Sequence, residues 1–459
     1  MIKSFISDII NRMKYDLVIK NGTIVNTAHF SSGDLPCGDI AVKDGKIAKI
    51  GKLEETDTAD EIYDASGKHI LSGIIDAHVH FRDPGLTEKE DFESGCIAAA
   101  FGGITFIADM PNVIPVTSTV ERFNEKVSIT KEKSFIDFGL FALLPEKNDE
   151  MEKLKNAGAL GFKVFLGTST GDVACPPPGI LFEQMKKSRE LNTRIGFHAE
   201  HNDLNVHFTL QNKNKNGNPG VLLADARPVI SEVMAIQTAI CFAQYTGAKI
   251  HIHHVTSKDG IMLIEEARRK RIEVSCETCP HYLFLDSAML NVNKVFPPIR
   301  DKIHQMGLWK AVKDGTIDMI ASDHAPHTAA EKALPLWEAP GGLTGVETMV
   351  PLLLNQVNRG ELDIGDVAWL TSENPAKIWG IYPQKGSLLP GTDADITIVD
   401  MNKKGIIDVN NLHSKSKTCA YHGMEVQGFP VSTIVRGKFI VKDGNLTGKK
   451  GFGTLVSPA

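Results

Sequence analysis

The feature that most constrains the fold is a regular alternation of helical stretches and short apolar strands through the middle of the chain. Helical periodicity marks residues 92–100, 231–244 and 258–270, and each of these stretches leads toward a strand. Such alternation is typical of a parallel sheet, and roughly 300 residues of it favour a closed barrel over an open sheet. The predicted fold class is therefore α/β, a TIM-like (β/α)8 barrel. Its predicted strands cover residues 70–75, 105–108, 135–140, 161–166, 195–197, 249–252, 272–275 and 319–321.

The two ends of the chain look like β-hairpins instead. Residues 17–25 and 40–50 each centre on an Asn-Gly or Asp-Gly dipeptide, which favours a tight hairpin turn, and residues 395–399 and 432–444 repeat the pattern. Neither block is large enough to bury its own core, so we expect one small β-sandwich built from both termini. The predicted boundaries are an extension over 1–14, a first sandwich part over 15–68, the barrel over 69–385, and a second sandwich part with a tail over 386–459.

Composition limits the kinds of partner and compartment. The net charge of -6 gives no reason to expect nucleic acid or an anionic membrane as partner. Seven scattered cysteines do not make a disulfide framework, which fits a reducing cytoplasm, and Cys276 and Cys279 are interpreted as small apolar residues near a strand end. Asp8 interrupts the only stretch that resembles a signal sequence, and no apolar run approaches the length of a membrane span. We therefore expect a cytoplasmic protein.

His78 and His80 close the first predicted barrel strand. Residues two apart on a strand point to the same face, so both imidazoles can reach a single metal ion. Arg82 shares that face and can clamp a negative group of a substrate. The alternative interpretation is a pair of surface histidines near the turn at Pro84 and Gly85.

Three later strands also end in residues that bind metals. His198, His254 and Asp323 each close a predicted apolar strand, and in a barrel the carboxyl ends of the strands lie at the face where active sites are found. One histidine at a strand end is more often a hydrogen-bonded polar residue than a ligand. Three such ends, following a His-x-His strand, are difficult to ascribe to packing and predict a metal site.

Lys163 lies inside the apolar strand predicted over 161–166, where an unpaired ammonium group is costly to desolvate. It can point outward and reach water along its aliphatic stem. Alternatively it points to the barrel axis, in which case the neutral amine can take up carbon dioxide and become an N-carboxylate that bridges two metal ions. Phe162, Val164 and Leu166 then face the helices.

The predicted donor set of four imidazoles and two carboxylates contains no thiolate. It suits a hydrolytic site with two divalent ions, for which Zn²⁺ is favoured and Mn²⁺, Fe²⁺ or Co²⁺ are alternatives. A catalytic site keeps an open position for water, and a metal lowers the pKa of bound water from 15.7 to about 7. The expected chemistry is hydrolysis by an activated water.

These features resemble the amidohydrolase superfamily over nearly the whole chain, from about residue 15 to residue 453. Within it the sequence is similar to the cyclic amidohydrolases: dihydroorotase, hydantoinase (dihydropyrimidinase) and allantoinase. The resemblance implies one metal ion bound by His78, His80, Lys163 and Asp323, and a second bound by Lys163, His198 and His254. It also implies that Asp323 is the catalytic proton shuttle.

Three segments are similar to dihydroorotase in particular. Residues 78–85, His-Val-His-Phe-Arg-Asp-Pro-Gly, have the form in which the arginine, here Arg82, holds the ring carboxylate of the substrate. Residues 109–112 and 322–328 imply that Asn112 and His327 contact the same carboxylate, which arginine and histidine can do as hydrogen-bond donors. We therefore expect reversible conversion of L-dihydroorotate to N-carbamoyl-L-aspartate, a step of pyrimidine biosynthesis.

Other segments differ from that pattern. Phe296 stands where dihydroorotases commonly have an asparagine that holds the ring amide. Residues 277–282 and the tail over 421–453 are more similar to allantoinase and hydantoinase. Residues 166–171 lack the tyrosine that hydantoinases place there. Allantoinase is therefore the main alternative, followed by a hydantoinase.

A non-enzymatic function is disfavoured, because scaffold relatives of these enzymes typically lack metal ligands and all six are present here. The expected partner is a small cyclic amide or ureide, and we expect a homodimer or homotetramer.

Overall fold

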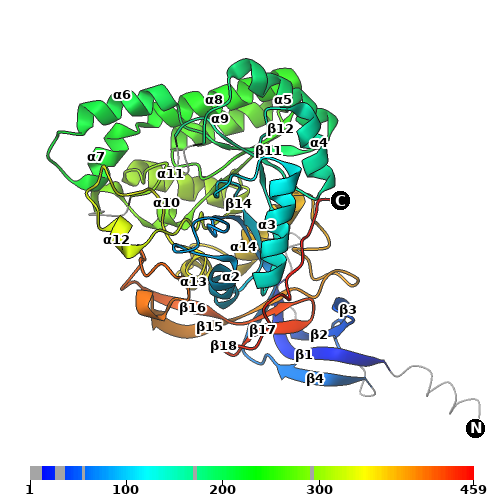
Figure 1. The fold of residues 1–459 in the computed structure, drawn as a ribbon. Coiled ribbons are helices and arrows are strands. Elements are labelled where there is room, and N and C mark those ends of the chain that lie inside the picture. Colours follow the sequence, from blue (N-terminus) through cyan, green and yellow to red (C-terminus); the bar gives the residue numbers. More distant parts are fainter. Residues whose placement is uncertain (1–12, 26–36, 54–56, 169–172, 290–293) are drawn as a thin grey trace, which may run out of the picture.

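The computed structural model describes residues 13–25, 37–53, 57–168, 173–289 and 294–459 (Figure 1). Most of the predicted N-terminal extension, residues 1–12, lies outside this part of the chain. In Figure 1 the barrel occupies the upper part of the molecule and the strands from the two chain ends lie together beneath it.

The middle of the chain forms the predicted barrel. Its strands pair in parallel in two sheets, β6-β7-β8 and β9 to β14, and a parallel bridge between Val79 and His324 joins β6 to the segment after β14. Only Phe141 separates β8 from β9, so together they act as one barrel strand that pairs with β7 on one side and β10 on the other. The strands are β6 (Ile74–Val79), β7 (Ile104–Asp109), β8 (Asp137–Leu140), β9 (Ala142–Leu143), β10 (Phe162–Phe165), β11 (Arg194–His198), β12 (Lys249–Ile252), β13 (Val274–Thr278) and β14 (Met319–Ile320).

Helices surround this sheet, and the three predicted from periodicity are confirmed as α2 (Phe92–Phe101), α8 (Val229–Thr246) and α9 (Lys258–Arg269). A side chain caps the start of α9, where Ser257 accepts a hydrogen bond from the amide of Gly260. The other α-helices are α3 (Val120–Lys133), α4 (Asn148–Asn156), α5 (Pro178–Glu190), α6 (Asn202–Asn212), α7 (Pro219–Ala226), α10 (Pro280–Phe284), α11 (Lys302–Lys313), α12 (Ala329–Lys332), α13 (Met349–Asn358), α14 (Ile364–Ala368) and α15 (Asn374–Ile378).

The stretch Pro219–Thr246, which contains α7 and α8, has the length and mean hydropathy of a membrane span, although the sequence showed no uninterrupted apolar run. Half of its most apolar window is buried in the protein. α8 packs against β12 and α9, so its apolar face covers the barrel.

Strands from both chain ends form one nine-stranded sheet in the order β18-β17-β16-β15-β5-β1-β2-β3, with β4 also paired to β1. Apolar side chains from both ends share one core, which includes Leu17, Ile40, Ile396 and Ile434. The prediction that the two termini build a common β-structure is therefore confirmed. The strands are β1 (Lys14–Val25), β2 (Cys37–Lys43), β3 (Lys46–Ile50), β4 (Thr58–Asp64), β5 (His69–Ser72), β15 (Ile396–Ile406), β16 (Glu425–Val435), β17 (Lys438–Lys442) and β18 (Asn445–Leu446).

Two local predictions differ from the structure. The dipeptide Asn21-Gly22 does not form a hairpin turn; β1 continues through it, and the register against β2 shifts between Ile19 and Gly22. The single strand expected over 70–75 is interrupted at Gly73, so that β5 joins the terminal sheet and β6 the barrel. A side chain at position 73 would lie 2.3 Å from the hydroxyl oxygen of Thr105, so this crossing point requires glycine.

A buried cluster of charges joins the terminal sheet to the barrel. The ammonium group of Lys385 lies 2.5 Å from a carboxylate oxygen of Asp137 in β8, 3.0 Å from Asp393 and 2.7 Å from Asp395. Arg436, which follows β16, also pairs with Asp137 at 3.0 Å. We call the group Asp137, Lys385, Asp393 and Asp395 the Lys385 cluster.

The C-terminal tail then runs back along the barrel in Figure 1, where Leu455 forms a parallel bridge with Phe138.

Candidate metal centre

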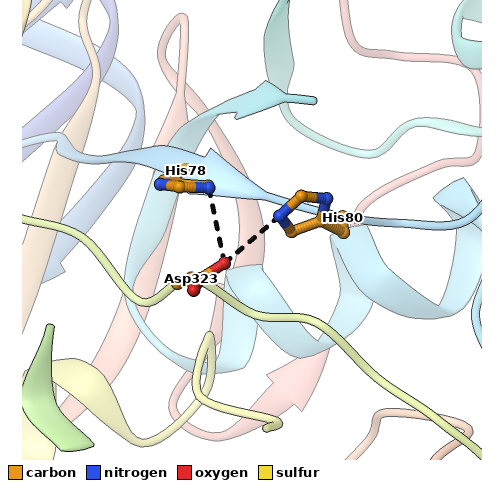
Figure 2. A group of neighbouring side chains, drawn as sticks. All are labelled: His78, His80 and Asp323. Atoms are coloured by element: carbon orange, nitrogen blue, oxygen red, sulfur yellow. Dashed lines mark ion pairs between the residues drawn. The ribbon is translucent and has the colours of Figure 1, made fainter. Parts of the chain in front are cut away.

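The end of β6 and the segment after β14 bring three predicted ligands together (Figure 2). Nε2 of His78 lies 3.4 Å, and Nε2 of His80 3.2 Å, from the same carboxylate oxygen of Asp323. The amide of His80 also donates to the carbonyl of His324 at 2.8 Å, which fixes the two segments side by side. All three side chains are buried and converge on one point.

The neighbouring strands β10, β11 and β12 supply the remaining predicted ligands. Nδ1 of His198 faces Nε2 of His254 at 3.0 Å. The ammonium nitrogen of Lys163 is buried and has no hydrogen-bond partner among the described residues. Burial lowers the pKa of Lys163 to about 8. A substantial fraction of neutral amine at physiological pH is what reaction with carbon dioxide requires.

Hydrogen-bond acceptors behind the histidines select which ring nitrogen carries the proton. Nδ1 of His78 lies 2.5 Å from the carboxylate of Glu277, and Nδ1 of His80 lies 2.8 Å from the amide oxygen of Asn112. On the other side Nε2 of His198 lies 2.9 Å from the carboxylate of Glu200. An acceptor takes an N–H, so the opposite nitrogen of each ring keeps its lone pair. Those lone pairs all point into the centre.

The donor set fits divalent metal ions. Burial, with the charge of Lys163 and the other histidines, holds the pKa values of His78 and His254 well below the ordinary value, which keeps their imidazoles in the neutral form that binds metals. The buried nitrogen of Lys163, which has no hydrogen-bond partner among the described residues, is otherwise unexplained, and it lies on the strand next to His198. His78, His80 and Asp323 can hold one ion, and His198 and His254 a second, with Lys163 between them.

Asp323 is suited to hold a negative charge. Burial alone would raise the pKa of its carboxyl, but the imidazole of His80 close by and the positive charge of Lys163 outweigh this and keep the pKa below the ordinary value. Asp323, His254 and Arg82 also share a rare feature: their φ angles are 45°, 39° and 61°, in the left-handed region. Strained backbone of this kind gathers at functional sites, where the surrounding structure enforces it.

The candidate ligands open onto one pocket. Eight of the nine residues predicted from the sequence line it, and the exception is His327. The lining residues are His78, His80, Arg82, Asn112, Lys163, Phe165, His198, His254, Val295, Phe296, Asp323, Ala325, Gly341 and Gly342.

Arg82 brings a buried positive charge to the pocket. Burial lowers the pKa of its guanidinium group only to about 10, so it stays charged at neutral pH. Its Nε donates to the carbonyl of Pro326 at 3.2 Å, and Nη2 lies 3.4 Å from Nε2 of His327. Among the described residues no carboxylate lies within ion-pair distance of Arg82. His327 therefore stands behind Arg82, where burial and the surrounding cations lower its pKa to about 2 and keep it neutral.

Phe296 forms another wall. Its ring packs against the guanidinium group of Arg227 at 3.8 Å, and Arg227 in turn forms an ion pair with Glu200, the acceptor behind His198. A side chain at position 341 would lie 2.7 Å from the Phe296 ring, so Gly341 leaves the space that the ring fills. The pocket lining thus combines the apolar side chains of Phe296, Phe165 and Val295 with the charged and metal-binding ones.

Sequence reasoning missed Glu200 and Glu277 because no local pattern marks the acceptor behind a ligand. It also gave Asn112 only a substrate role, whereas its amide oxygen faces His80. Cys279, interpreted as a small apolar residue, is buried near a strand end, and all seven cysteines are free. Its sulfur lies in one group with donor atoms of His281 and Asp323, all within 4.8 Å of one another, but burial raises its thiol pKa well above the ordinary value and disfavours a thiolate.

A loop of the terminal sheet braces the segment that carries Asp323. Ser414 donates a hydrogen bond to a carboxylate oxygen of Glu90, and the same oxygen lies 3.4 Å from Nε2 of His324. Two residues further on, the hydroxyl of Ser416 donates to the carbonyl of His327 at 2.5 Å. The loop between β15 and β16 therefore supports both ends of the 323–327 segment.

Comparison with known proteins gives consistent results. Residues 69–440 match the model described as the amidohydrolase family. An L-hydantoinase of Paenarthrobacter aurescens is 34% identical over 96% of this chain and 98% of its own length. A dihydroorotase of Acetivibrio thermocellus is 35% identical over 93% of this chain and 99% of its own length.

The solved structures that resemble this one include hydantoinases. The structure of L-hydantoinase (dihydropyrimidinase) from Arthrobacter aurescens superposes with a TM-score of 0.92 at 33% identity and covers 96% of this chain and all of its own. A dihydropyrimidinase from Brevibacillus agri superposes with a TM-score of 0.89 at 31% identity, over 96% of this chain and 98% of its own.

Proposed function

Because the chain belongs to the amidohydrolase family and is a cyclic amide hydrolase of the hydantoinase and dihydroorotase type, we propose that its substrate carries a carboxylate and is L-dihydroorotate. The reaction is reversible ring opening to N-carbamoyl-L-aspartate, which belongs to pyrimidine biosynthesis. The observation that carries this proposal is the charged, buried Arg82 in the pocket wall.

A buried cation without an anionic partner is costly. Arg82 lacks a carboxylate partner among the described residues, and its neighbour His327 is neutral. A ring carboxylate of the substrate would supply the missing charge, in the fork geometry that arginine offers. Asn112 also lines the pocket and is a further proposed contact of that carboxylate.

We further propose two divalent ions, with zinc favoured, held by His78, His80 and Asp323 and by His198 and His254, with Lys163 as an N-carboxylate between them. When bound, the ions would polarise the amide carbonyl and lower the pKa of water. Glu277, Asn112 and Glu200 hold the imidazoles in the tautomers that such binding requires.

Asp323 is the proposed proton shuttle. Its carboxylate is ionised, buried and directed into the pocket, so it can accept a proton from the attacking water and return it to the leaving ring nitrogen. Phe296, Phe165 and Val295 add apolar surface to the pocket lining.

A second candidate is hydrolysis of a 5-substituted hydantoin. Phe296 cannot donate or accept a side-chain hydrogen bond to a ring amide, and with Phe165 and Val295 it offers an apolar surface that suits an aliphatic or aromatic substituent. The similarity to an L-hydantoinase over 96% of the chain adds to this candidate. With a hydantoin as substrate, no carboxylate would pair with the charge of Arg82.

The two candidates separate in an assay of dihydroorotate, allantoin, dihydrouracil and a 5-substituted hydantoin, performed on the wild type and on Arg82→Met. Losing one charge-assisted contact in a dry site costs about 1.5–3 kcal/mol, so kcat/KM for dihydroorotate should fall by roughly ten- to a hundredfold. Uncharged cyclic amides are the internal control and should be turned over nearly as before. Wild-type protein that hydrolyses hydantoin or allantoin and leaves dihydroorotate untouched would refute the proposal.

We also propose a cytoplasmic homodimer or homotetramer. Exposed apolar side chains on neighbouring barrel helices, including Met234, Met262, Ile303 and Met306, provide a surface that a second copy could cover. Light scattering of the purified protein gives the mass directly, and a monomer would contradict this assignment.

A further inference from the structure

The interior of the barrel directly beneath the candidate ligands is polar. The interior of such barrels is usually filled by branched apolar side chains, whereas here His251, His253 and Glu277 are all buried on the strands β12 and β13 or immediately after them. Their contacts are not needed to explain binding of a substrate, because none of the three lines the pocket.

Glu277 is the centre of this polar group. One carboxylate oxygen lies 2.5 Å from Nδ1 of His78 and 3.0 Å from Nδ1 of His253, and the other lies 3.0 Å from Nε2 of His251. Burial raises the pKa of Glu277 well above the ordinary value, and the positive charge of Lys163 opposes this shift. In its ionised form the carboxylate only accepts hydrogen bonds, and each imidazole then donates its N–H to it. That assignment leaves the lone pair of His78 on Nε2, the nitrogen that faces Asp323.

The position of Glu277 is itself fixed from below. Nδ1 of His251 lies 2.9 Å from the hydroxyl of Ser275, which accepts a hydrogen bond from the guanidinium group of Arg194 at 3.1 Å. The hydroxyl of Ser275 can donate its hydrogen to Nδ1 of His251 at 2.9 Å or to the carbonyl of Ile250 at 3.3 Å. When it donates to Nδ1 of His251, Nε2 of that ring carries the proton that Glu277 accepts.

Charge gives a second reason for this arrangement. His78, His80 and Asp323 offer one negative charge to a doubly charged ion, and Glu277 in its ionised form adds another at one imidazole's distance. A carboxylate behind a metal-binding histidine raises the basicity of the ring and holds its orientation.

We propose that Glu277 is a positioning residue of the metal centre, which holds His78 with Nε2 directed at the ion and is itself held by His251 and Ser275. This inference rests on the metal-binding part of the proposed function and not on the identity of the substrate. A purely structural role, in which Glu277 only satisfies buried imidazoles, would affect folding and leave metal affinity unchanged.

The test measures metal affinity of metal-stripped protein by competition with a chromogenic chelator, with Zn²⁺ as the probe. Glu277→Gln keeps the size of the side chain but loses its charge and one acceptor. Its affinity for the ion bound through His78 should fall by about ten- to a hundredfold. The matched control is Glu232→Gln, another buried glutamate, which accepts from the amide and hydroxyl of Thr256 and touches no candidate ligand. Its metal affinity should equal that of the wild type.

Circular dichroism and thermal unfolding of the metal-free variants separate binding from folding. If Glu277→Gln does not fold, His251→Asn is the test variant, because it removes a hydrogen bond to Glu277 and leaves the contact between Glu277 and His78 in place. Its affinity for Zn²⁺ should be several-fold weaker than that of the wild type. The inference is overturned if Glu277→Gln, or His251→Asn in its place, binds Zn²⁺ as tightly as the wild type. Wild-type protein that binds no metal would overturn the proposed function first, and the inference with it.

Discussion

Lys163 and Lys385 are both only 1% exposed, yet their surroundings are opposite. Three carboxylates surround Lys385, and although burial alone would lower its pKa, their charge raises it above the ordinary value. No described group hydrogen-bonds to the nitrogen of Lys163, and burial lowers its pKa to about 8. The same side chain is thus fully paired at the junction of barrel and terminal sheet and unpaired at the barrel mouth.

The difference separates a structural charge from a functional one. A buried lysine with carboxylate partners holds segments together, and removing it leaves several charges unsatisfied. A buried lysine without partners is costly to retain, which makes it a candidate for chemistry that changes its charge. Conversion of Lys163 to an N-carboxylate would turn an unfavourable cation into an anion between two metal ions.

Removing the C-terminal strands destroys both the Lys385 cluster and the core shared by the two chain ends. It should have a larger effect than either lysine substitution. Truncation at Gly386 takes away Asp393, Asp395 and the strands β15 to β18, which share a core with β1 and β2. The fragment 1–385 should be insoluble or molten, as judged by sedimentation and near-UV circular dichroism. If it is soluble, folds cooperatively and retains activity, the two chain ends do not share a core.

Substitution of the unpaired lysine should abolish function and spare the fold. Lys163→Ala is expected to reduce cyclic amide hydrolysis by about a thousandfold, the upper range for loss of a preorganised charge, with partial rescue by short carboxylic acids. Thermal stability of the metal-free protein should be unchanged or higher, because no hydrogen bond of the described residues is lost. A fully active Lys163→Ala would end the functional interpretation of this residue.

Substitution of Lys385 should instead destabilise the fold and leave catalysis unchanged. Lys385→Met leaves the carboxylates of Asp137, Asp393 and Asp395 without their shared cation, which should lower the free energy of unfolding by about 3–5 kcal/mol. Urea denaturation gives this value, and kcat of the folded fraction should stay close to that of the wild type. The control is Lys310→Met, which removes an exposed ion pair with Asp314 and should not shift the unfolding midpoint. An equally small shift for Lys385→Met would show that its cluster does not stabilise the fold.

Much of the fold and the site follows from local pattern. The alternation of strands and helices predicts the barrel, and residues at strand ends must meet at one face of it, so the amino-acid order alone groups His198, His254 and Asp323. This grouping needs only the order of the elements. The direction of Lys163 stayed open, because a lysine in an apolar strand can also reach water past the helices, and the structure places it in the pocket lining.

What the sequence did not reveal depends on pairing between distant segments. Glu277 meets His251 and His78 only because β13 lies beside β12 in a register that aligns Ser275 with His251. Lys385 meets Asp137 across 248 residues of sequence. At Asn21 the local turn signal was overridden, since β1 pairs with β4 up to Lys20 and with β5 from Thr23.

The central claim is that Lys163 is unpaired because it becomes the anionic bridge of a metal centre. Metal analysis of purified wild type and Lys163→Ala, prepared side by side with carbon dioxide present, tests it most directly. The account predicts about two divalent ions per wild-type chain and the loss of at least one in Lys163→Ala. Equal metal content in the two proteins, or a wild type without metal, would contradict it.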